Sequence, residues 1–209
     1  MADFAFKHPV VADFVHLNKP DNQGVYSMTL LIDKDTPEGK ENIADVQAAI
    51  KEAVKYSFEK GQPFAGRKPE DVVPTLLLPL KDGDTDKFSK GDNTGKLRKD
   101  VYPEFAGKMF LSVKTKVDLT AKEHGIFDVN RRPVPAAQLY SGMLVRPAVW
   151  FHAYDNGNRG IMGTLNFVLR TGDGERLGGG GETDPFKLFG LPDTPEDSGD
   201  NSVFDAMGI

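Results

Sequence analysis

The sequence predicts a mostly-β protein: a small closed or partly open barrel with one main α-helix, loop insertions and a flexible acidic C-terminal tail. Several segments alternate apolar and polar residues at the two-residue period of a strand. Only residues 37–60 carry apolar residues at helical spacing over a long run. The chain after residue 181 is rich in Asp, Gly and Pro. A barrel suits this length better than a sandwich, because the strands are few and a helix interrupts them.

The strand of residues 24–35, "GVYSMTLLIDKD", has apolar residues on both faces, so we expect both faces to be covered. The helix of residues 37–60 follows, with Thr36 as its N-cap and Pro37 in its first turn. Gly61 then ends the helical pattern.

Further along the chain, "TLLLPL" (residues 75–80) predicts a short buried strand, and residues 81–100 form a long polar loop. Loops of such length are often functional. Residues 107–119 alternate as a strand, with Val117 on its apolar face. Residues 146–160 predict another strand, whose "DNGN" turn leads into residues 159–170 as a hairpin.

Composition excludes several classes of protein. The chain has 209 residues, 39% of them hydrophobic, which fits one ordinary domain with an appendage. It has no cysteine, so disulfides, thiolate catalysis and Cys-ligated metals are excluded, and the cytoplasm is the simplest compartment. No run approaches the roughly 18 apolar residues of a membrane helix, and the N-terminus does not resemble a secretory signal.

The net charge of −5 is unevenly distributed. From Glu182 onward there are seven acids and one base, Lys187, which sum to −6. The remaining 25 bases and 24 acids give residues 1–181 a charge of +1. Such asymmetry is typical of a protein with an interaction tail, often one that handles nucleic acid.

Two predicted strands place rings and positive charges opposite their apolar faces. The first carries Lys108, Phe110, Lys114 and Lys116 there, and the second carries Arg146, Trp150, His152 and Tyr154. Single-stranded nucleic acid needs this combination, because Lys and Arg meet phosphates while rings stack on unpaired bases. A second buried layer is the alternative, and Trp150 alone fits either. Unpaired lysines are seldom buried, which favours binding.

Other positions allow two interpretations each. Pro147 indicates an edge strand or a bulge, and a bulge would change the face that Arg146 takes. Arg131, Arg132 and Arg159 either belong to solvated turns or extend a path for phosphates.

Catalytic motifs are not evident. Asp82, Asp84 and Asp86 alternate like the start of a calcium loop, but the Gly and Glu that such a loop requires are missing. The four histidines form no metal-ligand pair, and no phosphate-binding Gly-rich motif opens a helix. We therefore expect no cofactor, no metal and no catalysis. A metal-dependent nuclease using this Asp loop stays open as an alternative, as does a phage structural protein.

Four strings, in order, span most of residues 20–181: "GVYSMTLLI", "PLKDGD", "YPEFAGKMFLSVKTK" and "LYSGMLVRPAVWFHAYDNGNRGIMGTLNFVLRTGDGERLGG". They resemble the phage single-stranded DNA-binding proteins once known as a domain of unknown function and related to the T-seven-type podovirus protein. The resemblance implies an oligonucleotide-binding (OB) barrel over residues 1–177. It also implies a Gly-rich hinge and acidic tail over residues 178–209 that contacts replication enzymes.

The tail mixes acids with hydrophobes, which suits a basic, apolar pocket on a partner. Its candidate residues are Asp193, Glu196, Asp197, Asp200, Phe204, Asp205 and Ile209. Related tails often end on an aromatic residue, whereas this one ends "VFDAMGI", so Phe204 or Ile209 takes the place of that anchor.

The function expected from these observations is sequence-tolerant coating of single-stranded DNA (ssDNA) during phage replication, recombination or repair. The setting is the cytoplasm of an infected bacterium, without a membrane partner. The tail would recruit replication or recombination proteins, and a homodimer is left open.

Overall fold

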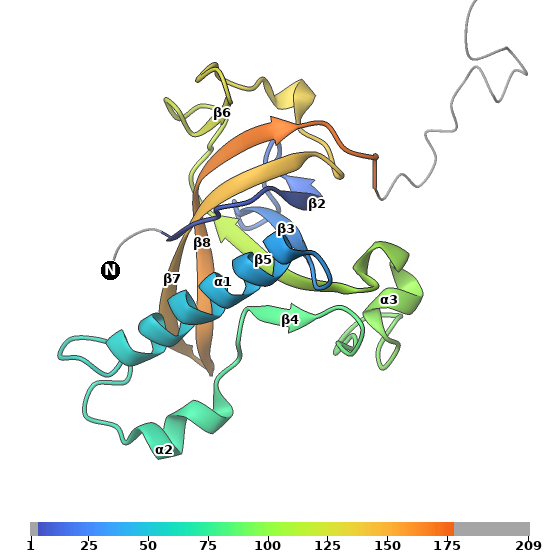
Figure 1. Cartoon of the computed structure of the whole chain (residues 1–209). Helices are drawn as coiled ribbons and strands as arrows, with labels where there is room; N and C mark the ends of the chain where they lie inside the picture. Colours follow the sequence, from blue (N-terminus) through green and yellow to red (C-terminus); the bar gives the residue numbers. More distant parts are fainter. Residues whose placement is uncertain (1–3, 178–209) are drawn as a thin grey trace, which may run out of the picture. The chain divides into compact units, whose positions relative to one another are not determined.

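The computed structural model describes residues 4–177, and five of its strands close into a barrel (Figure 1). These strands are β2 (Val10–His16), β3 (Tyr26–Asp33), β5 (Lys108–Thr115), β7 (Leu144–Asn156) and β8 (Asn158–Gly172). Their pairing runs β2–β3–β5–β8–β7 and returns to β2; only β5 and β8 are parallel. This closed five-stranded order is that of the OB fold, so the predicted barrel is confirmed.

Short elements surround the barrel. Strand β1 (Phe4–Ala5) pairs with β7, β4 (Leu80–Asp82) with β5, and β6 (Ile126–Asp128) with β8. The short helices are α2 (Pro69–Val72), α3 (Arg98–Val101), η1 (Val73–Thr75), η2 (Pro103–Phe105) and η3 (Ala136–Gln138). No helix within residues 4–177 is long and apolar enough to cross a membrane. The hinge and tail expected over residues 178–209 lie outside the described residues.

Helix α1 (Pro37–Tyr56) supplies one side of the core. The Thr36 Oγ1 accepts the Gly39 N–H at 3.1 Å, as expected of an N-cap, and the helix ends four residues before the predicted boundary at 60. Its buried face includes Val46 and Ile50, which join the barrel interior. Figure 1 shows α1 beside the barrel, where it contacts β3 and β7.

Strand β3 is covered on both faces, as predicted. Leu30 lies within the barrel core, whereas Leu31 belongs to a second, outer cluster with Phe105 and Phe110. This outer cluster is covered in part by the segment between β4 and β5. The apolar character of both faces of β3 follows from these two separate layers.

Two sequence predictions are wrong. Residues 75–80 are not a buried strand: Leu77 is 53% exposed and Leu78 is 49% exposed, because this segment lies on the outside of β8. Val117 is 50% exposed rather than on the inner face, because β5 ends at Thr115 and the alternation stops there.

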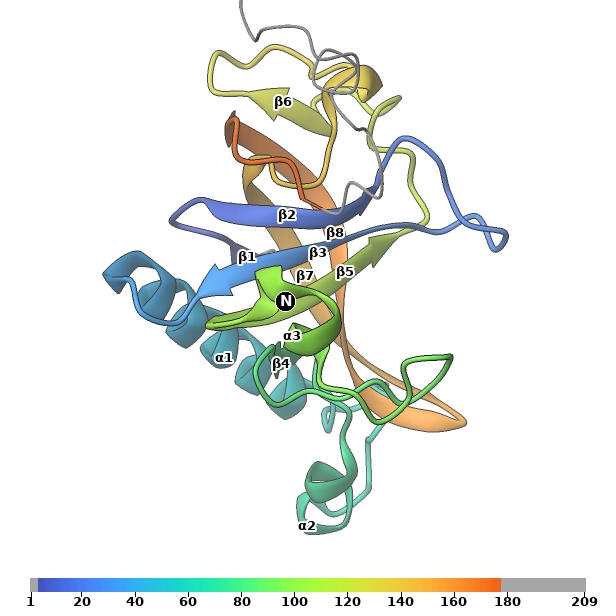
Figure 2. The same cartoon turned by 90° about the vertical axis from the view of Figure 1, so that its right-hand side faces the viewer.

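The β7–β8 hairpin is confirmed, with Gly157 at its turn in a left-handed conformation (φ 76°). Strands β5 and β8 pair only at residues 113–114 and 163–164. The tip of the hairpin therefore projects beyond the other strands (Figures 1 and 2).

Candidate nucleic-acid interface

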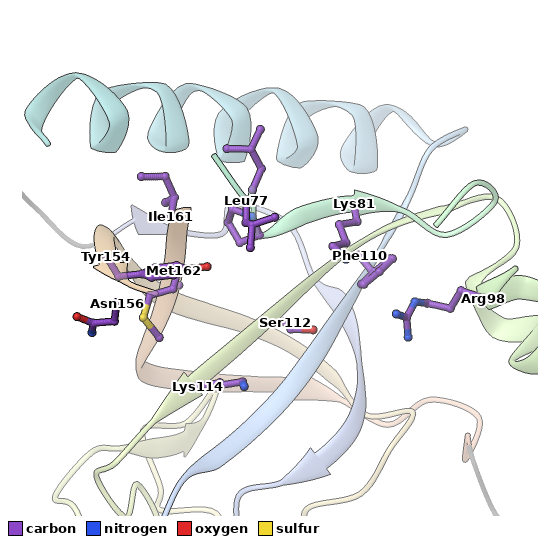
Figure 3. A pocket seen from close by; sticks show the side chains of 13 residues that line it. Leu77, Lys81, Arg98, Phe110, Ser112, Lys114, Tyr154, Asn156, Ile161 and Met162 are labelled. Carbon is purple, nitrogen blue, oxygen red and sulfur yellow. The ribbon is translucent and has the colours of Figure 1, made fainter. Parts of the chain in front are cut away.

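A cavity of about 560 Å³, called the groove below, opens on the outside of the barrel beside β5 and β8 (Figure 3). Strand β5 contributes Phe110, Ser112 and Lys114. The hairpin contributes Tyr154, Asn156, Ile161, Met162 and Gly163. The segment before and within β4 contributes Leu77, Leu78, Pro79 and Lys81, and α3 contributes Arg98. The groove is thus lined by apolar side chains with a few cationic and hydrogen-bonding groups among them.

The alternation of β5 explains its contribution to the groove. Leu111 and Val113 face inward and are fully buried, so Ser112 and Lys114 face outward. Phe110 also faces outward, but it is only 4% exposed, because Phe105 and a guanidinium group lie against its ring. The expectation that Phe110 is an open stacking ring is therefore not met.

Leu77 and Leu78 form one side of the groove, called the leucine wall below, and this segment is hydrogen-bonded to β8. The Leu77 N–H donates to the Arg159 carbonyl at 3.0 Å, and the Ile161 N–H donates to the Leu77 carbonyl at 2.9 Å. Gly160 permits this approach, since a Cβ there would lie 2.4 Å from the Leu77 oxygen and 2.8 Å from the Tyr154 hydroxyl. The absence of a side chain at Gly160 therefore lets both Leu77 and Tyr154 pack against β8 at this position.

Trp150 and His152 form a stacked pair on β7, with ring centroids 4.4 Å apart and planes inclined by 23°. Trp150 is 37% exposed, so it does not belong to a second buried layer. Trp150 is the β-sheet partner of Thr164 on β8, and Thr164 is in turn the partner of Lys114 on β5. Because paired residues share a face, this stack lies on the same outer face as the groove. Tyr154, two residues farther along β7, lines the groove itself.

Burial also affects His152. Its Nδ1 atom is enclosed without a hydrogen-bond partner within residues 4–177, and burial lowers the pKa of the imidazole below its usual value. The lowered pKa favours the neutral form of the ring that stacks on Trp150. A neutral flat ring is a suitable support for an exposed indole.

The cationic candidates separate into groups. Lys114 forms no ion pair within residues 4–177, and its side chain is exposed in the groove. Lys116 is exposed just past the end of β5. Lys108, at the other end of β5, is ion-paired with Asp33 and holds the pKa of that carboxyl below its usual value.

The arginines expected from the sequence, Arg131, Arg132, Arg146 and Arg159, do not line the groove. Arg146 donates its Nε–H to the Phe6 carbonyl at 2.9 Å and lines a separate cavity. Arg132 is ion-paired with Asp128 in the turn after β6, where Arg131 has a left-handed conformation. Arg159 lines a smaller, separate cavity. Leu77 lines both this cavity and the groove, so the two cavities are neighbours.

The three alternating aspartates Asp82, Asp84 and Asp86 are engaged in ion pairs. The Lys34 Nζ lies 2.8 Å from an oxygen of Asp82 and 2.6 Å from one of Asp84. Lys34 also lowers the pKa of the Asp84 carboxyl, and Asp86 pairs with cations of its own. Within residues 4–177, no group of three or more His, Asp or Glu side chains could hold a metal ion.

Sequence reasoning did not identify the leucine wall or the α3 arginine. The apolar run "TLLLPL" was the only signal for the wall, and it predicts burial as readily as exposure. The position of Arg98 depends on the conformation of the preceding loop, which no repeating pattern in the sequence predicts.

The family described as "Enterobacter phage Enc34, ssDNA-binding protein" matches residues 7–198 of this chain. This chain belongs to that family. The putative protein p50 of Acyrthosiphon pisum secondary endosymbiont phage 1 is 26% identical over 141 residues. That match covers 66% of each protein, so the chain spans just under two thirds of the length of that relative.

Solved structures share the fold of this chain. The ssDNA-binding protein of bacteriophage Enc34 has a TM-score of 0.56 and 23% identity, covering 87% of each chain. The same protein in complex with ssDNA has a TM-score of 0.56, covering 82% of this chain and 87% of that one. The bacteriophage T7 ssDNA-binding protein gp2.5 has a TM-score of 0.51 and 17% identity, covering 94% and 97%. At these identities the likeness establishes the fold.

Proposed function

We propose that this protein binds ssDNA, without catalysis and without reading its sequence, on the outer face formed by β5, β7 and β8. One observation carries the proposal: the groove lies beside an exposed aromatic stack on one face of the barrel. OB barrels bind oligonucleotides on the face of their second and third strands and at the adjoining loops. In this chain those strands are β3 and β5. Strand β5 belongs to the proposed face, whereas the outer face of β3 is covered by the cluster of Leu31, Phe105 and Phe110.

The roles of the side chains follow from their surroundings. Tyr154 and Trp150 provide planes on which bases stack, and His152 supports the indole. Lys114 in the groove binds phosphates. Lys116, just past the end of β5, and Arg159, in the smaller cavity next to the groove, add positive charge for the same purpose. The apolar wall excludes water from the bases. Lys108, Arg131, Arg132 and Arg146 do not line the groove and take no part in this proposal.

Family membership supports the same ligand. The family is described by an ssDNA-binding protein, and the Enc34 protein has been solved in complex with ssDNA. The nuclease alternative has less support, because the carboxylates of Asp82, Asp84 and Asp86 are paired with lysines and an arginine. A binding role requires no metal and no nucleophile.

The biological setting is part of the proposal. The protein coats single strands formed in replication, recombination or repair of a phage genome, in the cytoplasm of the host cell. The acidic residues after 181 recruit proteins that act on the same DNA, since seven acids and one base there would attract a basic pocket. Two copies associating as a homodimer would place two such tails on one strand.

The test is a titration of fluorescently labelled oligo(dT) with the full chain, followed by anisotropy at increasing salt. We expect tight binding at low salt that weakens linearly on a log–log plot as salt rises. Oligo(dA) and oligo(dC) should bind with similar affinity, because stacking is tolerant of sequence. An absence of binding at low salt, or an affinity independent of salt, would contradict the proposed function.

A further inference from the structure

The loop between β4 and α3 positions Arg98, the first residue of α3, at one end of the groove. The Arg98 guanidinium carbon lies near three rings, 4.5 Å from the centroid of Phe88, 4.7 Å from that of Phe110 and 5.4 Å from that of Phe105. Phe88 belongs to the loop and Phe110 to β5, so the cation joins the loop to the barrel. The Arg98 side chain is 19% exposed, and Figure 3 shows its nitrogen-bearing end directed toward the groove.

A carboxylate fixes the orientation of this guanidinium. The Arg98 Nε–H donates to Asp86 Oδ2 at 2.9 Å, and Arg98 Nη2 lies 2.8 Å from the same oxygen. The Arg98 backbone N–H also donates to the Asp86 carbonyl at 2.9 Å. The other carboxylate oxygen, Oδ1, accepts from Lys81 Nζ at 3.0 Å. Asp86 thus holds the arginine by its backbone and by one edge of its side chain.

These contacts leave part of the guanidinium available. An arginine has five N–H donors, and the carboxylate uses the Nε edge. Nη1 makes no hydrogen bond to the protein within residues 4–177. The rings of Phe88 and Phe110 lie 4.5 and 4.7 Å from the guanidinium carbon, so the Nη edge that makes no hydrogen bond is the part of the group left for a ligand. Two donors in a fixed plane suit the oxygens of a phosphate group.

We propose that Arg98 is a pre-positioned phosphate anchor of the groove, and that the 81–100 loop serves to hold it there. This inference rests on the proposed function. A surface lysine must lose rotamer freedom when it binds a phosphate, whereas the contacts with Phe88, Phe110 and Asp86 have already ordered Arg98. The loop's Asp-rich start is then explained by its ion pairs, which fix the loop that carries the arginine.

The alternative is a purely structural arginine that ties the loop to β5. Both roles predict that Arg98→Lys lowers the thermal midpoint, since lysine cannot reproduce the fork or the stacking. The anchor predicts in addition a loss of DNA affinity per folded molecule that is confined to one phosphate position of the strand. Arg67→Lys is a matched control: Arg67 is ion-paired with Asp155 at 2.6 Å and lies over the Phe64 ring, but it does not line the groove.

The experiment measures oligo(dT) affinity and thermal midpoint for the wild type, Arg98→Lys and Arg67→Lys. We expect Arg98→Lys to bind roughly tenfold more weakly at temperatures where it is folded, and Arg67→Lys to bind like the wild type. Arg98→Lys with wild-type affinity would overturn the inference while leaving the proposed function intact. Failure of the wild type to bind would overturn both.

A second measurement identifies the phosphate directly. On the shortest oligo(dT) that still binds with full affinity, which fixes the register, one neutral methylphosphonate linkage is moved along the strand, and at one position the wild type should lose affinity. At that position Arg98→Lys should lose less, because its contact is already impaired. Equal losses at every position for both proteins would contradict a phosphate contact by Arg98, even if the variant binds weakly for another reason.

Discussion

Lys114→Gln should weaken ssDNA binding without affecting folding. The Lys114 side chain is exposed in the groove and has no ion pair within residues 4–177, so its removal should change the free energy of unfolding by less than about 0.5 kcal/mol. For single strands each phosphate contact contributes about 0.7 to the slope of log affinity against log salt. Loss of one contact therefore predicts a slope smaller by about 0.7 and an affinity about fivefold lower at 0.1 M salt.

The same strand provides a matched control in Lys108→Gln. Lys108 also faces outward, but it lies about 20 Å farther along β5 and is ion-paired with Asp33. Its substitution removes the same charge and a half-buried ion pair, and should cost about 1 kcal/mol of stability. We expect its salt slope to match that of the wild type.

Anisotropy titrations of labelled oligo(dT) at four or more salt concentrations measure both slopes. The assignment of the groove would be refuted if the two variants lost the same slope. Equal losses would mean that charge anywhere on β5 acts only through the overall field of the protein. A larger loss for Lys108→Gln would place the DNA at the opposite end of the strand.

Three further predictions follow from other positions. Trp150→Leu keeps an apolar side chain but removes the stacking plane, so oligo(dT) affinity should fall roughly 5- to 150-fold with a small change in thermal midpoint; unchanged affinity would remove Trp150 from the interface. Gly160→Ala should cost about 1–3 kcal/mol in denaturant unfolding, because its Cβ would meet the Leu77 carbonyl; wild-type stability would contradict this packing. Asp13 is fully buried, and burial raises the pKa of its carboxyl. The folded state then keeps the proton to higher pH than the unfolded state, so stability falls as pH rises through the interval above the usual Asp pKa. Asp13→Asn should flatten that fall in melts from about pH 4 to 8; an unchanged profile would show that Asp13 does not titrate in this way.

The sequence predicted those elements whose periodicity is uninterrupted. Helix α1, strands β3 and β5 and the β7–β8 hairpin keep their period over most of their length. Strand β2 was missed, because a bulge between Asp13 and His16 and a left-handed Phe14 (φ 45°) break its alternation.

The site was predicted only where a strand carries it. Lys114 and Tyr154 line the groove because alternation on β5 and β7 directs them outward. Phe110 was wrongly expected to be open, because the arginine that covers it comes from a loop. Leu77 and Arg98 were missed for the same reason: their positions depend on tertiary hydrogen bonds and ion pairs that spacing does not encode.

Photo-cross-linking is the most direct test of the claim that the groove and the adjoining stack bind single strands. The full chain would be irradiated with an oligonucleotide containing 5-iododeoxyuridine, and the adducts located by peptide mass spectrometry. We expect adducts at Trp150, which is exposed, and at Tyr154, which is half-buried in the groove lining. Adducts confined to Phe127 and Phe167, which line a separate cavity beside β6, would contradict it.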